Sequence, residues 1–155
     1  MQRHGNAHVM LRLPPPIWMF LFLIAAGLIS YLSPFAPALR VLPLGVALIL
    51  GGIALAVSAV VRFRAAGTEI DPMSMTNKAL IVSGPYRFTR NPMYLSLVMF
   101  SLGIAIAVGT WPMFAVPVLV FVIAATGHIP FEEAKMHRQF GADWDNYCSR
   151  VRRWI

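Results

Sequence analysis

The chain has 155 residues, of which 58% are hydrophobic and 12% are charged. An average soluble domain has about 25% charged residues, so this composition indicates one small integral membrane domain and excludes an ordinary soluble enzyme. The formal net charge is +7, but the basic residues alternate with apolar runs and form no continuous face for nucleic acid. The single cysteine, Cys148, excludes an internal disulfide and a thiolate metal cluster.

Uncharged apolar runs predict four membrane spans in an all-α protein. The first covers residues 17–33, after three prolines, and the second covers residues 41–61. The second is long enough to cross a hydrocarbon core of about 30 Å at about 1.5 Å per residue. A further uncharged stretch is interrupted at Gly109, which divides it into residues 92–109 and 111–128. We expect these two halves to form a tight helical hairpin, the third and fourth spans.

The first apolar run has a second interpretation as a cleaved signal peptide. A basic leader and an apolar core precede Ala36, Pro37 and Ala38, a pattern of small residues typical of cleavage sites. The apolar core is long for a signal peptide, and cleavage would leave the later spans in the same orientation. Both interpretations place the remaining polar segments on the same side of the membrane.

The basic residues are distributed very unequally between the two sides of a four-span protein. Arg40 alone lies on one side, and the other basic residues and all the acidic ones lie on the opposite side. Because Lys and Arg accumulate in cytoplasmic loops, both termini and residues 62–91 are predicted to be cytoplasmic, in a multi-pass protein of a bacterial inner membrane. Apart from His128 at the last position of the fourth span, no Asp, Glu, Lys, Arg or His lies within the spans, which argues against a pump or an ion-coupled transporter.

The cytoplasmic loop ends in an unusual concentration of Tyr, Arg and Pro residues. The stretch GPYRFTRNPMY, residues 84–94, leads directly into the third span, with Pro92 as a first-turn proline. A loop of about thirty residues is too long for a plain connector, and such loops are often functional. Anchoring by the positive-inside rule and an interfacial aromatic belt are alternative explanations for these Arg and Tyr residues.

The last part of the chain, residues 130–155, is predicted to form two cytoplasmic or interfacial helices separated by Gly141. Glu132 and Glu133 fall in the first turn of the first helix, where the helix dipole favours carboxylates. Glu133 can also pair with His137, four residues later. These structural roles are alternatives to a role of the two glutamates in a site.

The second of these helices has one apolar stripe and a basic flank. The stripe recurs at helical spacing and consists of Trp144, Tyr147, Cys148, Val151 and Ile155. The basic residues mostly off it are Arg150, Arg152 and Arg153. We expect this helix to lie at the membrane surface, with its arginines bound to anionic headgroups and its cysteine packed rather than reactive.

Together, the two cytoplasmic segments resemble the isoprenylcysteine carboxyl methyltransferase and phospholipid methyltransferase superfamily. GPYRFTRNPMY before the span hairpin and EEAKMHRQFGADWDNY after it are similar to the family pattern of GPY, then R-H/N-P-x-Y, a hairpin and a Glu pair. Residues 67–154 match this pattern in order and spacing. The resemblance implies an integral membrane methyltransferase that uses S-adenosylmethionine, held on the cytoplasmic side by the C-terminal half of the chain.

The resemblance also implies the residues of the site. By position, catalytic roles fall on Arg90, Asn91 and Glu133. Cofactor-binding roles fall on Tyr86, Arg87, Arg90, Asn91, Tyr94, His128, Glu132 and Glu133. Asn91 departs from the histidine of many relatives, so no imidazole base is available there. His128 stands where the eukaryotic carboxyl methyltransferases that the chain resembles have an arginine, so their substrate geometry does not transfer directly.

The chemistry of the candidate residues suits S-adenosylmethionine, which carries a sulfonium, an ammonium, a carboxylate and an adenine ring. Glu132 or Glu133 offers a carboxylate for the cations, and Arg90 offers donors for the cofactor carboxylate. Tyr86 and Tyr94 offer aromatic surface. The glycine-rich turn and alternating strand–helix pattern of soluble methyltransferases are absent. The four histidines are scattered along the sequence, so no metal site is predicted.

We expect methyl transfer to a lipophilic or small membrane-partitioning acceptor, such as an isoprenylcysteine-type carboxylate, a thiol or a lipid amine. The acceptor would enter laterally between the helices, and the cofactor would enter from the cytoplasm. The alternative is a non-catalytic membrane assembly or scaffold protein that keeps the methyltransferase fold. Membrane lipid is the expected neighbour, no nucleic-acid partner is expected, and the sequence leaves the oligomeric state open.

Overall fold

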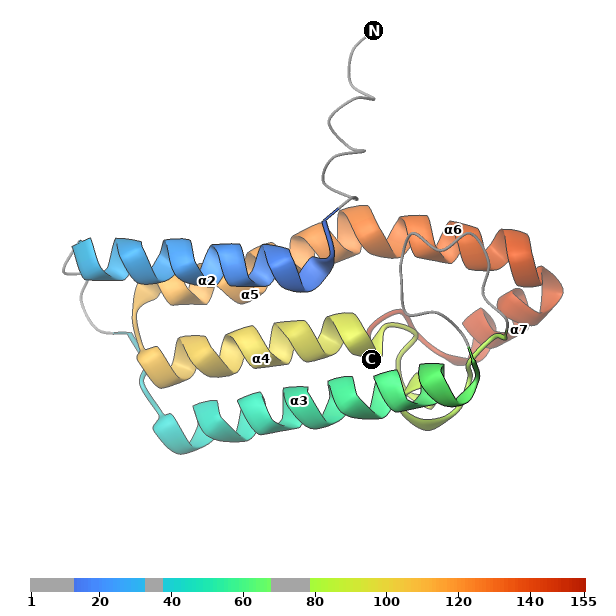
Figure 1. Ribbon diagram of the computed structural model, residues 1–155, viewed down its shortest axis with the longest axis horizontal. Coiled ribbons are helices and arrows are strands. Elements are labelled where there is room, and N and C mark those ends of the chain that lie inside the picture. The colour runs from blue at the N-terminus through green and yellow to red at the C-terminus, as the bar shows by residue number, and fades with distance from the viewer. Residues whose placement is uncertain (1–12, 33–37, 68–78) are drawn as a thin grey trace, which may run out of the picture.

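The structure is a computed structural model that describes residues 13–32, 38–67 and 79–155 (Figure 1). This described part is helical, with no β-strand, which confirms the predicted all-α fold class. In chain order the elements are α2 (Pro15–Leu32), α3 (Leu42–Ala65), the 3₁₀ turn η1 (Gly84–Arg87), α4 (Pro92–Val108), α5 (Trp111–Ile123), the π-helical η2 (Ala124–His128), α6 (Ile129–Phe140) and α7 (Ala142–Arg150).

The long helices lie side by side along one direction. α3 packs on α4, α4 on α5, and α5 on α2 (Figure 1). By length and composition, three described helices can cross a membrane: α2, α3 and the stretch Trp111–Phe140. α4, the predicted third span, is a shorter apolar helix of 17 residues. The described residues therefore hold three candidate spans and one apolar helix at the lower end of the spanning range.

The helix expected to begin at Pro130, which carries Glu132 and Glu133, is not separate from the predicted fourth span. α5, η2 and α6 form one continuous helical stretch of 30 residues. Pro130 has no N–H to donate to the carbonyl of Thr126, and its ring crowds that carbonyl. The chain accommodates the proline with a local π-helical widening, η2, instead of a break. The two glutamates therefore lie on the direct continuation of a candidate span.

Glycines bring α3 and α4 into backbone contact. A Cβ atom at Gly103 would lie 2.7 Å from the backbone oxygen of Gly45, and one at Gly52 would lie 2.9 Å from the carbonyl oxygen of Ser96. Small residues at such contacts allow membrane helices to pack closely. This contact fixes the start of α4, and with it the Tyr- and Arg-rich stretch that precedes α4.

We call the end of the bundle at the α4–α5 connection the closed end. Gly109 ends α4 with a φ of 74°, in the left-handed region, and Arg40 Nε donates to the carbonyl of Ala107 at 3.1 Å. The hydroxyl groups of Ser30 and Thr110 lie 2.9 Å apart and form a hydrogen bond between α2 and the connection. The turn at Gly109 and these two hydrogen bonds therefore close this end of the bundle.

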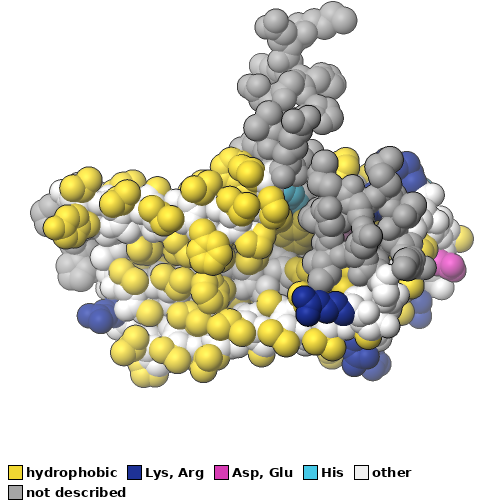
Figure 2. Space-filling model, in the orientation of Figure 1, with side chains coloured by type: hydrophobic (Ala, Val, Ile, Leu, Met, Phe, Trp, Pro, Cys, Tyr) yellow, Lys and Arg dark blue, Asp and Glu magenta, His cyan; other side chains and the backbone are white. Residues whose placement is uncertain are grey.

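The surface along the helices is strongly apolar. Phe20, Ile24 and Leu28 of α2 are exposed, as are Leu50 and Val57 of α3, and hydrophobic side chains cover most of the bundle in Figure 2. Most of the visible Lys and Arg side chains gather at the end that carries η1, α6 and α7, which we call the site end. An apolar surface of this extent suits lipid rather than water, as expected of an integral membrane protein.

The C-terminal helix is shorter than predicted. α7 ends at Arg150, and Val151 is extended with φ −123° and ψ 128°, so Val151 and Ile155 do not continue the apolar stripe. Trp144 and Tyr147 of the stripe are buried. Outside the helix, carbonyl groups of the tail accept hydrogen bonds from the segment before α4. The prediction of helices through residue 155 is wrong for its last five residues.

Candidate functional site

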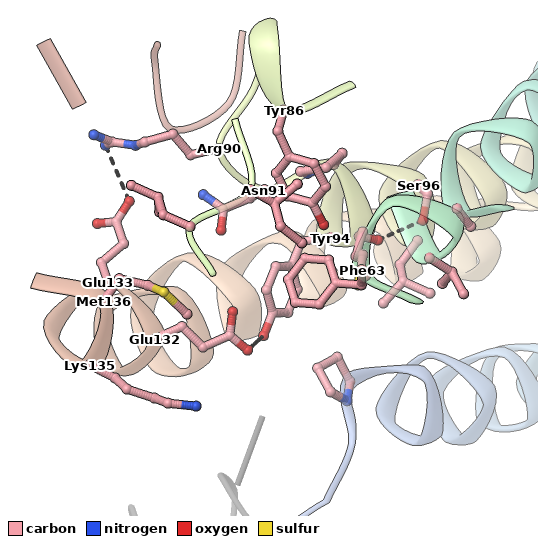
Figure 3. A pocket seen from close by; sticks show the side chains of 18 of the residues that line it. Phe63, Tyr86, Arg90, Asn91, Tyr94, Ser96, Glu132, Glu133, Lys135 and Met136 are labelled. Atoms are coloured by element: carbon pink, nitrogen blue, oxygen red, sulfur yellow. Dashed lines mark hydrogen bonds and ion pairs between the residues drawn. The ribbon is translucent and has the colours of Figure 1, made fainter. Parts of the chain in front are cut away.

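A cavity of about 370 Å³ lies at the site end, between a polar and an apolar wall (Figure 3). The polar wall includes Tyr86, Arg90, Asn91, Tyr94, Glu132 and Glu133. The apolar wall includes Pro16 at the start of α2, Ala56, Val60 and Phe63 of α3, and Met93 and Leu97 of α4. The volume lies in the range of roughly 300 to 1,000 Å³ that is usual for small-molecule sites.

Tyr94 and Glu132 join α4 to α6 across the cavity. The phenol of Tyr94 donates a hydrogen bond of 2.6 Å to Oε1 of Glu132 (Figure 3). Tyr94 is only 6% exposed, because it packs with Ala124 and Ile129 in a buried cluster. A hydrogen bond to a carboxylate is among the stronger ones, so this contact fixes the direction of the Glu132 carboxyl group.

Glu133 binds two arginines instead of the predicted histidine. Its Oε1 lies 3.2 Å from Nη2 of Arg90 and accepts a hydrogen bond of 3.2 Å from Nε of Arg153, while its Oε2 accepts one from Nη2 of Arg153. His137 instead lies 3.3 Å from Asp145, where both side chains are mostly exposed. The Glu133 carboxyl is 15% exposed, and permanently charged guanidinium groups satisfy it better than a solvent-facing imidazole does. Arg153 is therefore paired with Glu133 while its side chain stays 43% exposed, and its headgroup contact remains a prediction.

Arg90 has one side-chain donor left over. Its guanidinium carbon lies 5.9 Å from the ring centroid of Trp144, within the range of a cation–π contact. Its Nε is buried and has no hydrogen-bond partner among the described residues. Buried donors in folded proteins are nearly always paired, so an acceptor on a bound molecule could supply the partner that this nitrogen lacks.

Tyr86 and Tyr147 hold η1 against α7. The phenol of Tyr147 donates to the backbone carbonyl of Tyr86 at 2.7 Å, and the Tyr86 ring lies 5.6 Å from that of Phe63. Burial raises the pKa of Tyr86 far above its ordinary value, and the Glu132 carboxylate raises it further. Burial also raises the pKa of Tyr147, against the lowering effect of Arg90. Both phenols therefore stay neutral hydrogen-bond donors at physiological pH.

Asn91 lies on the polar wall, but its side chain points to the C-terminal tail. Its Nδ2 donates to the carbonyl of Arg153 at 3.0 Å, and its backbone N–H donates to the hydroxyl of Thr89 at 3.1 Å. Asn91 is 7% exposed, so these bonds satisfy polar groups that are removed from solvent. The Asn91 side chain thus ties this part of the polar wall to the C-terminal tail. The catalytic and cofactor-binding roles of Asn91 remain predictions.

Two of the eight predicted cofactor-binding residues are not among the described residues that line the cavity. Arg87 is exposed on η1. His128 is 3% exposed and lies beside Tyr94, with ring centroids 6.2 Å apart, and its Nε2 has no partner among the described residues. The other six line the cavity together.

Some lining residues were missed by the sequence analysis. Trp144 was predicted to face the membrane surface, yet it lines the cavity. Ala56, Val60 and Phe63 do so as well, and their spacing of i, i+4 and i+7 places them on one face of α3. Lys135 follows Glu132 by three residues and lies on the same wall. The spacing on α3 was available as a signal, but any apolar membrane helix offers several such faces.

Within the described ranges, no cluster of three or more His, Cys, Asp or Glu side chains could hold a metal ion. The named residues of the polar wall supply two carboxyl groups, two phenols, one guanidinium and one amide, drawn from η1, the segment before α4, α4 and α6. Such a wall suits an organic ligand with both charged and aromatic parts.

Comparison with known proteins agrees with this arrangement. Residues 41–143 match the phospholipid methyltransferase family. The match begins within the predicted second span and so extends the resemblance toward the N-terminus. No curated protein and no solved structure matches the chain significantly. The family lies in the superfamily that the two cytoplasmic segments resemble, and this prediction is confirmed. The chain belongs to the phospholipid methyltransferase family and is a membrane methyltransferase.

Proposed function

We propose that the protein transfers a methyl group from S-adenosylmethionine to a lipophilic acceptor that enters from the bilayer. One observation carries this proposal: a single cavity joins a polar wall at the site end to an apolar wall formed by the candidate spans. A water-soluble cofactor and a membrane-bound acceptor need two such walls in contact.

The residues of the polar wall fit the cofactor. Glu132 has one oxygen bound to Tyr94 and lines the cavity, so its carboxylate is placed to attract the cofactor's cationic part. The buried Nε of Arg90 is a donor for the cofactor's carboxylate. The rings of Tyr86 and Trp144 can flank the adenine. When bound, the cofactor supplies an electrophilic methyl group on its sulfonium.

The apolar wall fits an acceptor with a hydrocarbon part. Ala56 and Val60 belong to a candidate span, and Pro16 lies at the start of another. Leu97 of α4 completes this side of the cavity. A lipid-like molecule can leave the acyl region and enter here without crossing the charged surface. Within the family resemblance, an isoprenylcysteine-type carboxylate, a thiol and a lipid amine are the candidate reacting groups.

The wall residues contribute mainly by positioning. Methyl transfer needs the reacting atoms held about 3 to 3.5 Å apart and in line. Tyr94 orients the Glu132 carboxyl group, and Glu133 orients Arg90, so both sides of the polar wall are fixed before a ligand arrives. The apolar wall excludes water, which strengthens the electrostatic contacts at the polar wall.

We also propose that α4 is a fourth span, with the site end on the cytoplasmic side. α4 has 17 residues and packs between α3 and α5, so it is in large part shielded from lipid and tolerates a length near the lower limit. In a Cys148→Ser background, a cysteine at Trp111, which is exposed just after α4, should react with a membrane-impermeant maleimide outside intact cells, and one at Arg64, before α4, should not. Labelling at both positions or at Arg64 alone would contradict this topology.

The test of the proposed function is calorimetric titration of the detergent-purified protein with S-adenosylmethionine and S-adenosylhomocysteine. Arg90→Ala and Glu132→Gln should lower the affinity at least tenfold, because each removes one charged partner of the ligand. Arg138→Ala is the matched control, since Arg138 is exposed on α6 and the same charge is lost.

Two results would count against the proposal. The first is no saturable binding by folded protein in detergent and again in lipid, which would favour a non-catalytic protein that keeps the fold. The second is an equal loss of affinity in all three variants, which would point to a general effect on the folded protein instead of a site. If binding is found, transfer of a labelled methyl group to lipid, thiol and carboxylate candidates identifies the acceptor.

A further inference from the structure

We propose that the last five residues, 151–155, form a strap that positions the cofactor wall, and that Arg153 is its positioning residue. This inference rests on the proposed function and adds a residue to it that lies outside the family match, which ends at residue 143, and that was given no role in the site by the sequence pattern. The strap is not helical, begins with the extended residue Val151 where α7 ends and lies against the segment that precedes α4.

The backbone of the strap accepts hydrogen bonds from three successive residues, 89–91, of the stretch 84–94, which we call the motif segment. The carbonyl of Arg152 accepts the backbone N–H of Arg90 at 3.0 Å. The carbonyl of Arg153 accepts the Thr89 hydroxyl at 3.1 Å and the Asn91 amide at 3.0 Å. Thr89 is 3% exposed and Asn91 is 7% exposed, so neither side chain can readily turn to water instead. The conformation of the motif segment therefore depends on two carbonyls at the opposite end of the sequence.

The side chain of Arg153 acts on the same wall from its other side. It forms a two-pronged pair with Glu133, whose Oε1 also lies 3.2 Å from Arg90. Arg90 is thereby held at its backbone by the strap and at its guanidinium by a glutamate that the strap fixes. A bidentate guanidinium–carboxylate pair restricts both groups in angle as well as distance.

Trp154 anchors the strap to the bundle. Its ring lies 4.7 Å from that of Phe121 on α5, with an interplanar angle of 32°. It also packs against the buried cluster of Tyr94, Ala124 and Ile129. Tyr94 is the donor to Glu132, so the Trp154 anchor acts on Glu132 through Tyr94, while the Arg153 guanidinium binds Glu133 directly.

None of residues 151–155 is among the described residues that line the cavity. The strap therefore has no direct contact to offer a ligand in the cavity and acts through Arg90, Asn91 and Glu133. Loss of the Arg153 side chain should leave the cavity present but its wall less fixed, which lowers ligand affinity more than it lowers stability.

The experiment compares Arg153→Ala, Arg153→Lys and Arg152→Ala in the full chain. Arg152→Ala is the matched control, because Arg152 is exposed, loses the same charge and keeps the backbone carbonyl that bonds to Arg90. Hydrogen–deuterium exchange of the peptide covering residues 84–94 is measured first, without any ligand. Cofactor KM and kcat, and thermal unfolding, are then measured for each variant.

We expect faster exchange in residues 84–94 for Arg153→Ala and a rise of about tenfold in the KM for S-adenosylmethionine, with a smaller change in kcat. Arg153→Lys should recover part of the affinity, because an ammonium keeps the charge but not the two-pronged geometry. Arg152→Ala should resemble the unmodified protein in all measurements.

Unchanged exchange in residues 84–94 for Arg153→Ala would overturn the strap, whatever the affinity. Equal effects of Arg153→Ala and Arg152→Ala would overturn the positioning role and indicate a general effect of charge. If the unmodified protein binds no S-adenosylmethionine but Arg153→Ala still speeds exchange, the strap stands and the proposed function fails. If it binds the cofactor and neither exchange nor KM responds to Arg153→Ala, the proposed function stands and the strap fails.

Discussion

The two ends of the same helix bundle are closed in different ways. At the closed end, α4 and α5 are joined by a turn at Gly109, and Arg40 binds a backbone carbonyl of α4. At the site end, side chains from η1, the segment before α4, α6 and α7 lie around a cavity. Several of them bind one another although they are far apart in the sequence. The comparison shows that a turn and hydrogen bonds to the backbone hold the helices together at one end. At the other end the helices leave a cavity, and contacts between polar side chains hold its wall in place.

This contrast predicts that changes in the glycine-packed part of the bundle act on stability, while changes at the site end act on function. The largest effect is expected for Gly103→Leu, at the contact of α3 and α4. A Cβ there would already lie 2.7 Å from the backbone oxygen of Gly45 and 2.8 Å from Ile49, so the helices must separate. We expect a loss of about 3 kcal/mol in the free energy of unfolding, measured by thermal or denaturant unfolding in detergent.

Gly27→Ala is the control for that variant. A Cβ at Gly27 would meet only the end of the flexible Met113 side chain, at 3.5 Å, which is an ordinary contact. The stability of the Gly27→Ala variant should therefore change little. An equal loss in both variants would show that glycine itself, and not the contact of the two helices, is what the bundle requires.

The next effect is expected at the site end, for Tyr94→Phe. The substitution keeps the ring in its buried cluster but removes the hydrogen bond to Glu132. We expect kcat/KM to fall roughly 30-fold, equivalent to about 2 kcal/mol, because the carboxyl group loses a charge-assisted bond that orients it. Unfolding should shift much less than for Gly103→Leu. A variant that loses stability but keeps its activity would contradict the division between the two ends.

A smaller effect is expected at the turn of the closed end, for Gly109→Ala. Gly109 has a φ of 74°, and its Cβ would lie 2.6 Å from Cβ of Arg40. We expect a loss of about 1.5 kcal/mol in stability with unchanged cofactor affinity. Gly67→Ala separates the two causes, since Gly67 has a φ of 61° and no described atom within 4 Å of the added Cβ. Equal losses in the two variants would assign the whole effect to backbone strain.

The smallest effect is expected for the reactivity of Cys148 at the site end. Burial raises the pKa of its thiol, against the lowering effect of Arg90. Because a higher pKa leaves less thiolate at a given pH below it, alkylation by iodoacetamide at pH 7 to 8 should be slower in the folded than in the unfolded protein. Arg90→Ala should slow the reaction further, since it removes the positive charge. Faster alkylation in the folded protein would contradict a packed cysteine.

The sequence predicted more of the cavity lining than of the contacts between the residues that line it. Six of the eight predicted cofactor-binding residues line one cavity, because order and spacing in the family pattern fix which segments meet. Helical spacing offered His137 as an alternative partner of Glu133, whereas the fold brings Arg90 and Arg153 to it. Local spacing determines which side chains can meet along one helix, but the packing of separate segments determines which pairs are buried and charged.

By itself, the sequence determined the all-helical membrane class, the two polar segments at one end and the acidic pair with its arginine- and tyrosine-rich counterpart. These features depend on apolar run length and on local composition, which need no knowledge of the fold. Only the tertiary structure decided that α5 continues through η2 into α6, that the chain leaves the helix after Arg150, and that its last residues bind the segment before α4. The physical reason is that the same local sequence permits two outcomes in each case. A helix can continue through a proline by forming a π-helical turn or can end there, and the residues after Arg150 can stay helical or leave the helix. Each choice depends on which buried hydrogen-bonding groups the distant segments present.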